Sequence, residues 1–437
     1  MAKKRIVILG GGVAGLSVAW HLKKRKHECI LFEKEPQVGG LCRSKNAAGF
    51  TFDLSGHLLH FRKSYTFKLV KYLLKGNLAE HERKAFIYSF GRFTQYPFQA
   101  KLYELPPQIA KECFLGYLKI AKNPAHERKK DMNFLQWIQC NFGEGIAKYF
   151  MVPYNRKFWT VPLQQLTCEW LEGFIPVPTL PQVKEGMIRK SRRKFGYNAR
   201  FWYPKNGGII QLPLAFAGEI KNVYTNCPIT EIDLKRKTIT VSSGEKEKFD
   251  ILISTIPLPE LPRIISSLPK QILRFFDQLR WNSVFNLNLG IDKQGLMAKR
   301  HWIYFPDKDI SFFRIGFPHN YSFSVTPPNK SSIYTEVSYP QGSILRPKNT
   351  VSSIKDDLER VGIIAAKDRI CIEDINDIKY AYAIYDSNYK AARHNIFQFL
   401  AQQGIICCGR YGSWRYMSME DAILDGREKA TECLKRI

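Results

Sequence analysis

Paired metal-binding cysteines and long hydrophobic runs are both missing from this sequence of 437 residues. The ten cysteines contain no Cys-x-x-Cys pair, and the only close pair, Cys407-Cys408, is poorly placed for a disulfide because the two residues are adjacent. No apolar run reaches the roughly 18 residues that a membrane-spanning helix needs. We therefore expect free thiols, no metal site, no transmembrane span and a cytoplasmic location.

Acidic residues are also scarce. The chain has 39 Asp and Glu against 67 Lys and Arg, which gives a formal net charge of +28. Such a charge suits an anionic ligand, a nucleic acid or an anionic membrane surface. Because the basic residues are spread along the chain and no basic–aromatic motif matches a nucleic-acid reader, we expect no specific nucleic-acid partner. Peripheral contact with a membrane stays open, and so does the oligomeric state.

The sequence does contain a strand–turn–helix–strand pattern at its N-terminal end. An apolar, β-branched run over residues 5–9 predicts a buried parallel strand. Residues 16–26 have helical periodicity, and residues 29–32 predict a second strand. This order is that of a βαβ unit.

Glycines fill the turn between the first strand and the helix. Gly10, Gly12 and Gly15 form a Gly-x-Gly-x-x-Gly pattern, which permits a tight turn, a close approach of the backbone to a pyrophosphate and close packing of helix on strand. Glu33 ends the second strand, where a carboxylate accepts a bond from a ribose 2′-OH and repels a 2′-phosphate, so NADP is disfavoured. The candidate dinucleotide-binding residues of this unit are Gly10, Gly12, Val13, Ala14, Gly15, Glu33 and Lys34.

A second glycine pair favours FAD over NAD. Gly39-Gly40 and Arg43 follow Glu33, an arrangement that resembles FAD-binding oxidoreductases of the amine-oxidase and glutathione-reductase type. The arginine can neutralise phosphate, and the glycines let the chain pass close to the cofactor. Residues 203–208 and 251–257 resemble two further segments of the same superfamily. We therefore expect FAD as the cofactor.

These patterns predict an α/β protein with a discontinuous Rossmann-like FAD-binding domain, a helical domain and an antiparallel β-sheet substrate domain. The expected boundaries are 1–66, 201–265 and 396–437 for the FAD-binding domain, 67–200 for the mainly helical domain, and 266–395 for the mixed β-sheet domain. A helix over 418–437 ends the chain, and Ser418 can cap it with Asp421 three residues later.

Five further segments narrow the family. They are Gly56-His57-Leu58-Leu59-His60, Tyr96-Pro97-Phe98-Gln99, Pro153-Tyr154-Asn155-Arg156-Lys157-Phe158-Trp159, Trp302-Ile303-Tyr304-Phe305-Pro306 and Gly409-Arg410-Tyr411-Gly412-Ser413-Trp414-Arg415-Tyr416. Each is similar to a segment of the UDP-galactopyranose mutases, and they occur in the same order over nearly the whole chain. The chain therefore resembles a divergent member of that family, within the amine-oxidase/protoporphyrinogen-oxidase superfamily.

The resemblance implies a flavin-dependent isomerase of polysaccharide biosynthesis. In that family, N5 of reduced FAD acts as a nucleophile on the anomeric carbon and the nucleoside diphosphate leaves reversibly. The sugar thereby changes between its pyranose and furanose forms without net redox change. The implied partner is a nucleoside-diphosphate sugar, and NAD(P)H is a candidate external electron donor.

The resemblance also implies roles for particular residues. The implied catalytic residues are His57, Arg83 and Arg314, and Arg314 is expected to clamp the diphosphate because a guanidinium makes bidentate bonds to phosphate oxygens. FAD contacts are implied for Gly39, Gly40, Leu41, Arg43, Gly56, His57, Ile229, Gly409, Arg410, Met419 and Glu420. Substrate contacts are implied for Tyr96, Phe98, Gln99, Asn155, Trp159, Trp302, Tyr304, Arg314, Tyr321, Tyr382 and Tyr416.

Two departures from the family pattern leave alternatives open. Phe174 stands where an arginine that grips the substrate diphosphate is expected, and Tyr382-Ala383-Ile384-Tyr385 replaces a Tyr-Pro-Thr-Pro segment. Both are compatible with another nucleotide sugar as substrate. An FAD oxidoreductase of the amine-oxidase or protoporphyrinogen-oxidase type is the main alternative, and a flavin-binding protein without catalysis is a third.

Overall fold

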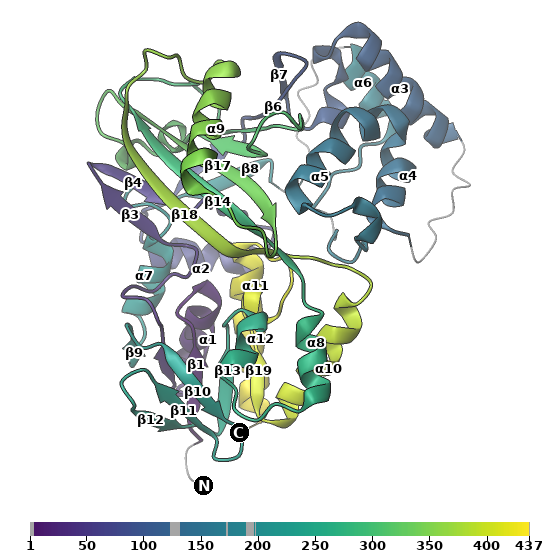
Figure 1. Ribbon diagram of the computed structural model, residues 1–437. Coiled ribbons are helices and arrows are strands. Elements are labelled where there is room, and N and C mark those ends of the chain that lie inside the picture. The colour runs from purple at the N-terminus through teal and green to yellow at the C-terminus, as the bar shows by residue number, and fades with distance from the viewer. Residues whose placement is uncertain (1–3, 123–131, 172–173, 189–195, 197, 437) are drawn as a thin grey trace.

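The N-terminal strand lies inside a five-stranded parallel sheet, as its apolar sequence predicts (Figure 1). The computed structural model describes residues 4–122, 132–171, 174–188, 196 and 198–436. The strand order is β19-β13-β1-β2-β9. These strands are Ile405–Cys407, Ile251–Ser254, Ile6–Leu9, Ile30–Phe32 and Val223–Tyr224. Segments from the start, middle and end of the chain thus form one sheet, so the Rossmann-like unit is discontinuous.

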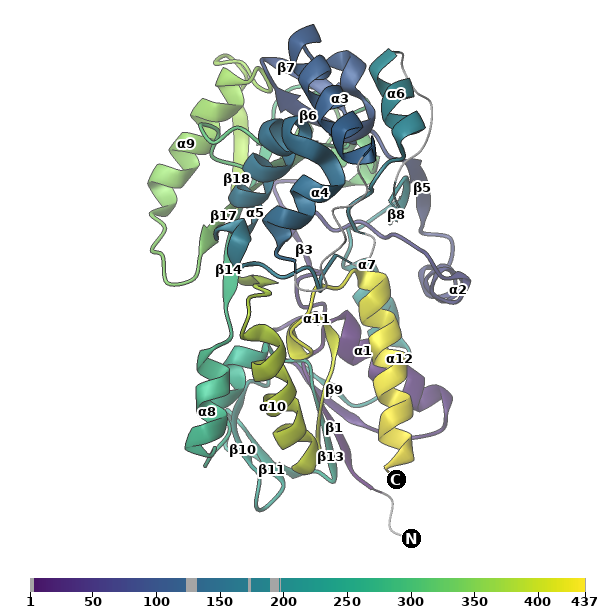
Figure 2. The same cartoon turned by 90° about the vertical axis from the view of Figure 1, so that its right-hand side faces the viewer.

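Helices cover this sheet on both faces (Figure 2). On one side α1 (Val13–Lys24) packs against α12 (Met419–Lys435) and against α7 (Gln211–Gly218), which in turn contacts α2 (Ser64–Leu74). On the other side α10 (Tyr389–Gln402) packs on β19 and on α8 (Lys270–Asp277). A three-stranded sheet, β10 (Ile229–Asp233), β11 (Thr238–Val241) and β12 (Lys246–Lys248), lies beside them.

A seven-stranded sheet forms a second unit of the molecule. Its strand order is β18-β14-β17-β16-β15-β6-β7. All its neighbours are antiparallel except β15 and β6, which run parallel. The strands are Ile370–Ala383, Trp281–Ile291, Ser331–Pro340, Arg314–Gly316, Trp302–Tyr304, Ala85–Ser89 and Arg92–Gln95. Helix α9 (Pro347–Arg360) covers one face and buries Ile354 and Leu358 against Leu287 and Ile333.

The remaining large unit is helical. It contains α3 (Pro107–Lys122), α4 (Phe134–Ile146), a π-helical turn (Ala147–Met151), α5 (Val152–Trp159) and α6 (Leu180–Ile188). Asn133 caps α4, because its Oδ1 accepts a bond from the backbone N–H of Gln136 at 3.0 Å. Helices α3 and α4 cross closely at Gly145, where a Cβ would lie 2.6 Å from the Cα of Cys113.

Small elements connect these units. Two-stranded sheets pair β3 (Ser44–Ala47) with β4 (Phe50–Asp53) and β5 (Ala79–Glu82) with β8 (Arg200–Tyr203), and α11 covers Gly409–Gly412. Short 3-10 turns are Phe98–Ala100, Leu102–Glu104, Leu163–Gln165, Leu258–Arg263, Pro318–Asn320 and Phe323–Val325. No helix among the described residues is both long enough and apolar enough to cross a membrane.

The α/β class and the discontinuous parallel sheet are confirmed, and the structure differs from the sequence-based boundaries in two places. Strands β6 and β7 belong to the seven-stranded sheet although they fall inside the segment 67–200, which was expected to be mainly helical. Helix α10 packs on β19 and begins at Tyr389, ahead of the expected boundary at 396. Both differences arise from pairing between segments far apart in the sequence, which local periodicity does not report.

We expect Gly426→Ala to lower the free energy of unfolding by about 1–3 kcal/mol, the usual cost of overpacking. Gly426 lies where α12 touches α1, and an added Cβ would come within 2.7 Å of the Cβ of Ser17 and 2.8 Å of the carbonyl oxygen of Ala14. Chemical denaturation measures the loss. In the control Gly218→Ala, the new Cβ meets no atom within 4 Å, so this variant should keep or gain stability. Equal losses in both variants would refute the packing argument.

Candidate active site

A cavity of about 1270 Å³ lies where the parallel sheet, the seven-stranded sheet and the helical unit meet. It begins at the carboxyl ends of β1 and β2, passes along β18 and ends against α5. A single small-molecule site usually measures about 300–1,000 Å³. The space therefore fits a dinucleotide together with a second ligand.

The glycine turn brings three backbone segments together at one end of this cavity. Gly10 has φ 99°, a left-handed conformation that suits glycine. The N–H of Gly39 donates to the carbonyl of Gly11 at 2.8 Å, and a Cβ on Gly40 would lie 3.3 Å from the Cα of Gly12. Helix α1 begins directly after Gly12, so its first N–H groups face an opening without side chains. This is the geometry that receives a pyrophosphate.

Glu33 borders the same opening and is buried. Its two carboxylate oxygens accept backbone N–H bonds from Gly11 at 2.6 Å and from Glu35 at 3.0 Å. A carboxylate has about four acceptor positions, so capacity remains for a ribose hydroxyl. Arg43 donates to the carbonyl of Gly40 at 2.9 Å, and its hydrogen bond to Glu35 lowers the pKa of that carboxyl. These residues fit the adenosine and diphosphate of FAD.

His57 and Arg410 line the cavity farther along. Burial lowers the pKa of His57 to about 4, so its imidazole is neutral at pH 7. Arg410 donates to the carbonyls of Ala381 at 2.8 Å and Met417 at 3.2 Å, and its guanidinium lies 4.8 Å from the ring centre of Tyr382. None of the described residues gives Arg410 a carboxylate partner in an ion pair. The charge of Arg410 is therefore one that a bound anion can neutralise.

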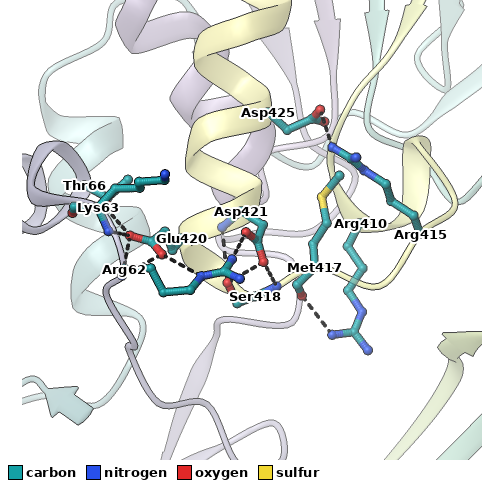
Figure 3. Close-up of polar contacts among 10 residues, drawn as sticks. All are labelled: Arg62, Lys63, Thr66, Arg410, Arg415, Met417, Ser418, Glu420, Asp421 and Asp425. Carbon is teal, nitrogen blue, oxygen red and sulfur yellow. Dashed lines mark hydrogen bonds and ion pairs between the residues drawn. The ribbon is translucent and has the colours of Figure 1, made fainter. Parts of the chain in front are cut away.

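The N-terminus of α12 closes this part of the wall (Figure 3). The backbone N–H of Asp421 donates to Ser418 Oγ at 3.2 Å, which confirms the expected cap. Glu420 does not line the cavity. Its carboxylate points toward the start of α2, where it accepts the backbone N–H of Arg62 and of Lys63, each at 2.9 Å. The carboxylate of Glu420 thus anchors α12 to the start of α2, and the FAD contact that the resemblance implies for this residue stays a prediction.

Arg314 is held by a residue that sequence reasoning missed. Arg314 on β16 is the register partner of Glu336 on β17, and Glu336 is 1% exposed. Arg314 donates from Nη2 to Glu336 Oε1 at 2.7 Å and from Nε to Oε2. Ser55 Oγ donates to the same Oε1. Tyr334 and Glu336 lie two residues apart on β17, so their side chains point to the same face of the sheet. This alternation is the sequence signal from which a carboxylate in the tyrosine-lined wall could have been predicted.

An aromatic wall surrounds Arg314. The tyrosines that line the cavity are Tyr96, Tyr154, Tyr304, Tyr334, Tyr380, Tyr382, Tyr411 and Tyr416. Burial raises the pKa of Tyr304 and of Tyr382, so their hydroxyls stay protonated and can donate hydrogen bonds at neutral pH. Phe174 also lines the cavity and meets Tyr416 edge-on at 4.7 Å. Tyr154 and Tyr334 were not among the expected substrate contacts.

Four buried polar atoms of the cavity lining have no hydrogen-bond partner among the described residues. They are Oε1 of Gln99 and the indole Nε1 of Trp159, Trp170 and Trp302. Gln99 is fixed by its other end, since its Nε2 donates to the carbonyl of Pro176 at 2.7 Å. An unpaired buried acceptor or donor costs free energy unless a ligand pairs with it. These atoms fit a ligand that has both donors and acceptors.

The cavity brings together most of the residues that the sequence singled out. Those that line it are Gly10, Gly12, Val13, Ala14, Glu33, Lys34, Gly39, Gly40, Leu41, Arg43, Gly56, His57, Tyr96, Gln99, Asn155, Trp159, Ile229, Trp302, Tyr304, Arg314, Tyr382, Gly409, Arg410, Tyr416 and Met419. Gly15, Arg83, Phe98, Tyr321 and Glu420 do not. Among the described residues, no three His, Cys, Asp or Glu side chains gather as a metal site.

The expected residues outside the lining pack against other side chains or backbone. Gly15 lies inside α1, and a side chain there would collide with the carbonyl of Gly10. Arg83 sits behind Tyr96, with its guanidinium 4.7 Å from that ring centre. Phe98 stacks on Phe150 at 5.1 Å, and Tyr321 packs on Tyr203 at 5.0 Å. The direct contacts implied for Arg83, Phe98 and Tyr321 therefore stay predictions.

Comparison with known families agrees with this geometry. The pattern of the flavin containing amine oxidoreductase family matches residues 13–434. The chain belongs to this family. As a member of the flavin-containing amine oxidoreductases, it is an FAD-dependent enzyme, and its glycine turn and Glu33 are the residues that would hold the dinucleotide.

Similar proteins of this family differ in their activities. A crystal structure of reduced UDP-galactopyranose mutase superimposes with a TM-score of 0.93 at 26% identity, covering 100% of this chain and 95% of that one. A putative protoporphyrinogen oxidase from Exiguobacterium sp. 255-15 superimposes with a TM-score of 0.78 at 16% identity, covering 100% of both chains. At this identity the likeness supports the fold alone.

Two curated proteins match parts of the sequence. Coproporphyrinogen III oxidase of Bacillus subtilis is 20% identical over 328 residues, 68% of this chain and 69% of that protein. An uncharacterized protein in the nifH2 3′ region of Methanothermococcus thermolithotrophicus is 46% identical over 55 residues, which is 13% of this chain and 53% of that protein. These matches are compatible with membership of the superfamily. They do not identify the reaction, which has to be inferred from the chemistry of the cavity.

We expect the low pKa of His57 to make stability depend on pH. Between about pH 6.5 and 4 an unfolded chain protonates this histidine while the folded chain leaves it neutral, so the free energy of unfolding falls as pH falls. His57→Asn should reduce the loss between pH 7 and 4.5 by roughly 1–2 kcal/mol. Denaturation at each pH measures the slope. Replacing the exposed His394 with Asn is the control; the same slope for His57→Asn as for wild type would contradict a buried neutral imidazole.

Proposed function

We propose that this flavin-containing amine oxidoreductase is a nucleotide-sugar mutase that interconverts the pyranose and furanose forms of a sugar on a nucleoside diphosphate. The observation that carries the proposal is Arg314, held on one edge by Glu336 while it lines a cavity walled by tyrosine hydroxyls. The likeness to reduced UDP-galactopyranose mutase over the whole chain supports the same reading.

The hydrogen-bond donors that would bind the diphosphate carry little net positive charge. Bonds to described residues use two of the five N–H groups of Arg314, and three remain for phosphate oxygens. Because Glu336 neutralises Arg314, the excess positive charge in the cavity comes from Arg410. The hydroxyls of Tyr304 and Tyr382 add neutral donors. Such a site can bind a diphosphate and also release it, which a reversible transfer requires.

The flavin would supply the covalent chemistry. In its reduced state, bound FAD offers a nucleophilic nitrogen that can attack an anomeric carbon. The protein's part is to orient the sugar, to keep water out and to balance charge. The aromatic wall with Tyr154 and Phe174 excludes water, and neutral His57 can hydrogen-bond without adding charge. Arg410 favours negative charge near it, whether on the cofactor or on the diphosphate.

The test compares the two redox states of one preparation. Enzyme reduced with dithionite, or with NAD(P)H as the proposed natural donor, is mixed with UDP-galactopyranose and with a panel of other nucleotide sugars. Chromatography should reveal the furanose isomer of at least one sugar, with turnover in the reduced state and none in the oxidised state. Inactivity of both states across the whole panel would refute the mutase proposal.

A second candidate is an FAD oxidoreductase of the protoporphyrinogen-oxidase type. Phe174 favours it, because an apolar ring occupies the place where the mutase pattern has a phosphate-gripping arginine. Such an enzyme would transfer electrons from its substrate to the flavin. Loss of the oxidised-flavin absorbance on addition of coproporphyrinogen or protoporphyrinogen under nitrogen would support this candidate.

We expect Arg314→Lys to weaken UDP binding by about tenfold to a hundredfold. A charge-assisted hydrogen bond contributes about 1.5–3 kcal/mol, and lysine keeps the charge next to Glu336 while losing the planar fork. Titration calorimetry with UDP measures the change. The control is Arg300→Lys, since Arg300 is a half-buried guanidinium against Phe93 outside the cavity. Unchanged affinity in Arg314→Lys would exclude Arg314 as a phosphate ligand.

A further inference from the structure

The turn that leads into Tyr416 contains a residue with an unusual backbone conformation. Trp414 has φ 50°, in the left-handed region that favours glycine, and it is 1% exposed. A bulky residue stays in this region only where the surrounding structure fixes it. The contacts that hold this turn are therefore part of how the cavity wall is built.

Two tyrosines hold the turn by its backbone. The hydroxyl of Tyr389, the first residue of α10, donates to the carbonyl of Trp414 at 2.5 Å. The hydroxyl oxygen of Tyr385 accepts the backbone N–H of Tyr416. The two supporting rings pack on each other with their centres 4.3 Å apart, and both residues are buried. The pair thus fixes the chain at Trp414 and again just after it.

The tyrosine pair is itself fixed from behind. Oδ1 of Asp386 accepts the backbone N–H of Tyr389 at 3.0 Å, and Oδ2 lies 3.6 Å from Nη1 of Arg280. The carbonyl of Tyr385 accepts the N–H of Thr167 at 2.7 Å. Neither tyrosine of the pair lines the cavity. Their hydroxyls therefore act on the turn from a fixed support outside the lining.

Tyr416, by contrast, lies in the cavity wall. Its ring meets Phe174 edge-on at 4.7 Å, stacks on Tyr382 at 5.8 Å and faces the guanidinium of Arg410 at 4.9 Å. None of the described residues bonds to its hydroxyl, which is thus available to a ligand. The place of this hydroxyl depends on the backbone of Tyr416, and through it on Tyr385.

The support comes from a part of the chain that departs from the mutase pattern. Tyr385 stands at the last position of the Tyr-Pro-Thr-Pro segment, where a proline has no hydroxyl that could accept the N–H of Tyr416. Phe174, in the place of an arginine, packs against the same Tyr416. The chain thus lacks a charged donor at this point and has extra support for a neutral one.

We propose that Tyr385 is a positioning residue that sets the affinity of the cavity for an anionic diphosphate through the hydroxyl of Tyr416. Tyr385 acts from outside the lining, and Tyr389 assists by holding the neighbouring carbonyl. The proposal deepens the mutase function and rests on it for the identity of the diphosphate.

The test measures UDP binding to the flavin-loaded protein by titration calorimetry. Tyr385→Phe keeps the ring but removes the acceptor for the N–H of Tyr416, and it should raise the Kd for UDP about threefold to tenfold. Tyr416→Phe removes the hydroxyl that faces the ligand and should raise the Kd by a similar factor. The double variant should bind no more weakly than Tyr416→Phe alone, because Tyr385 acts through the hydroxyl that is then missing.

Two further variants separate positioning from general stability. Tyr389→Phe frees the carbonyl of Trp414 and should also weaken UDP binding. Tyr65→Phe removes a hydroxyl that lies 2.6 Å from Nε2 of His21, outside the cavity lining, and it should keep the wild-type Kd. Chemical denaturation of each variant checks that the loss of affinity does not simply follow the loss of stability.

The outcomes distinguish this proposal from the proposed function. Unchanged UDP affinity in Tyr385→Phe, or an undiminished effect of this substitution in the Tyr416→Phe background, overturns the positioning role whether or not the protein is a mutase. If the cycle behaves as expected and no sugar nucleotide is isomerised, the positioning role stands and the mutase proposal fails. If UDP does not bind to the wild type, the same cycle with inorganic pyrophosphate decides, and no binding of either anion refutes both proposals.

Discussion

The cavity depends on two buried carboxylates of α12, because the chain forms its walls from segments more than 300 residues apart. Glu420 binds the backbone of Arg62 and Lys63, and Asp425 accepts the N–H of Gly409 at 2.6 Å. Glu420 is 1% and Asp425 4% exposed. Removing one partner from a buried charged contact typically costs about 3–5 kcal/mol. One helix thereby fixes both the start of α2 and the turn that carries Arg410, and the cofactor wall requires both.

Charge balance explains how one family can serve different reactions. An oxidoreductase needs a cavity that admits an apolar reductant, whereas a transferase of nucleotide sugars needs donors for a diphosphate. In this chain the cation nearest the aromatic wall, Arg314, is already neutralised by Glu336, and Phe174 adds an apolar surface. Arg410 lines the same cavity and donates its hydrogen bonds only to carbonyls among the described residues. The site thus offers an anion hydrogen-bond donors more than net charge, which suits the weak and reversible phosphate contacts of the proposed function.

The part of the site that could be predicted from sequence is the part made by local chain geometry. Gly10, Gly12 and Glu33 follow one another within a single βαβ unit, so spacing alone places them around a pyrophosphate. Ser418 and Asp421 form a cap three residues apart for the same reason. Glu336 is different, because its contact with Ser55 spans 281 positions and its pairing with Arg314 depends on the register of β16 with β17. Likewise β6 joins β15 only in the folded sheet, so the expected helical segment contains two of its strands.

Three of the singled-out side chains share a position outside the lining. Phe98 and Tyr321 occupy motif positions that imply substrate contacts and Arg83 one that implies a catalytic role, yet none of the three lines the cavity. Arg83 contacts the ring of Tyr96, which does line the cavity, and Phe98 stacks on Phe150, which also does. A motif is maintained by the residues that orient ligand contacts as much as by the contacts themselves. Sequence resemblance therefore reports the whole supporting shell, and only the three-dimensional arrangement separates the side chains that touch a ligand from those that hold them in place.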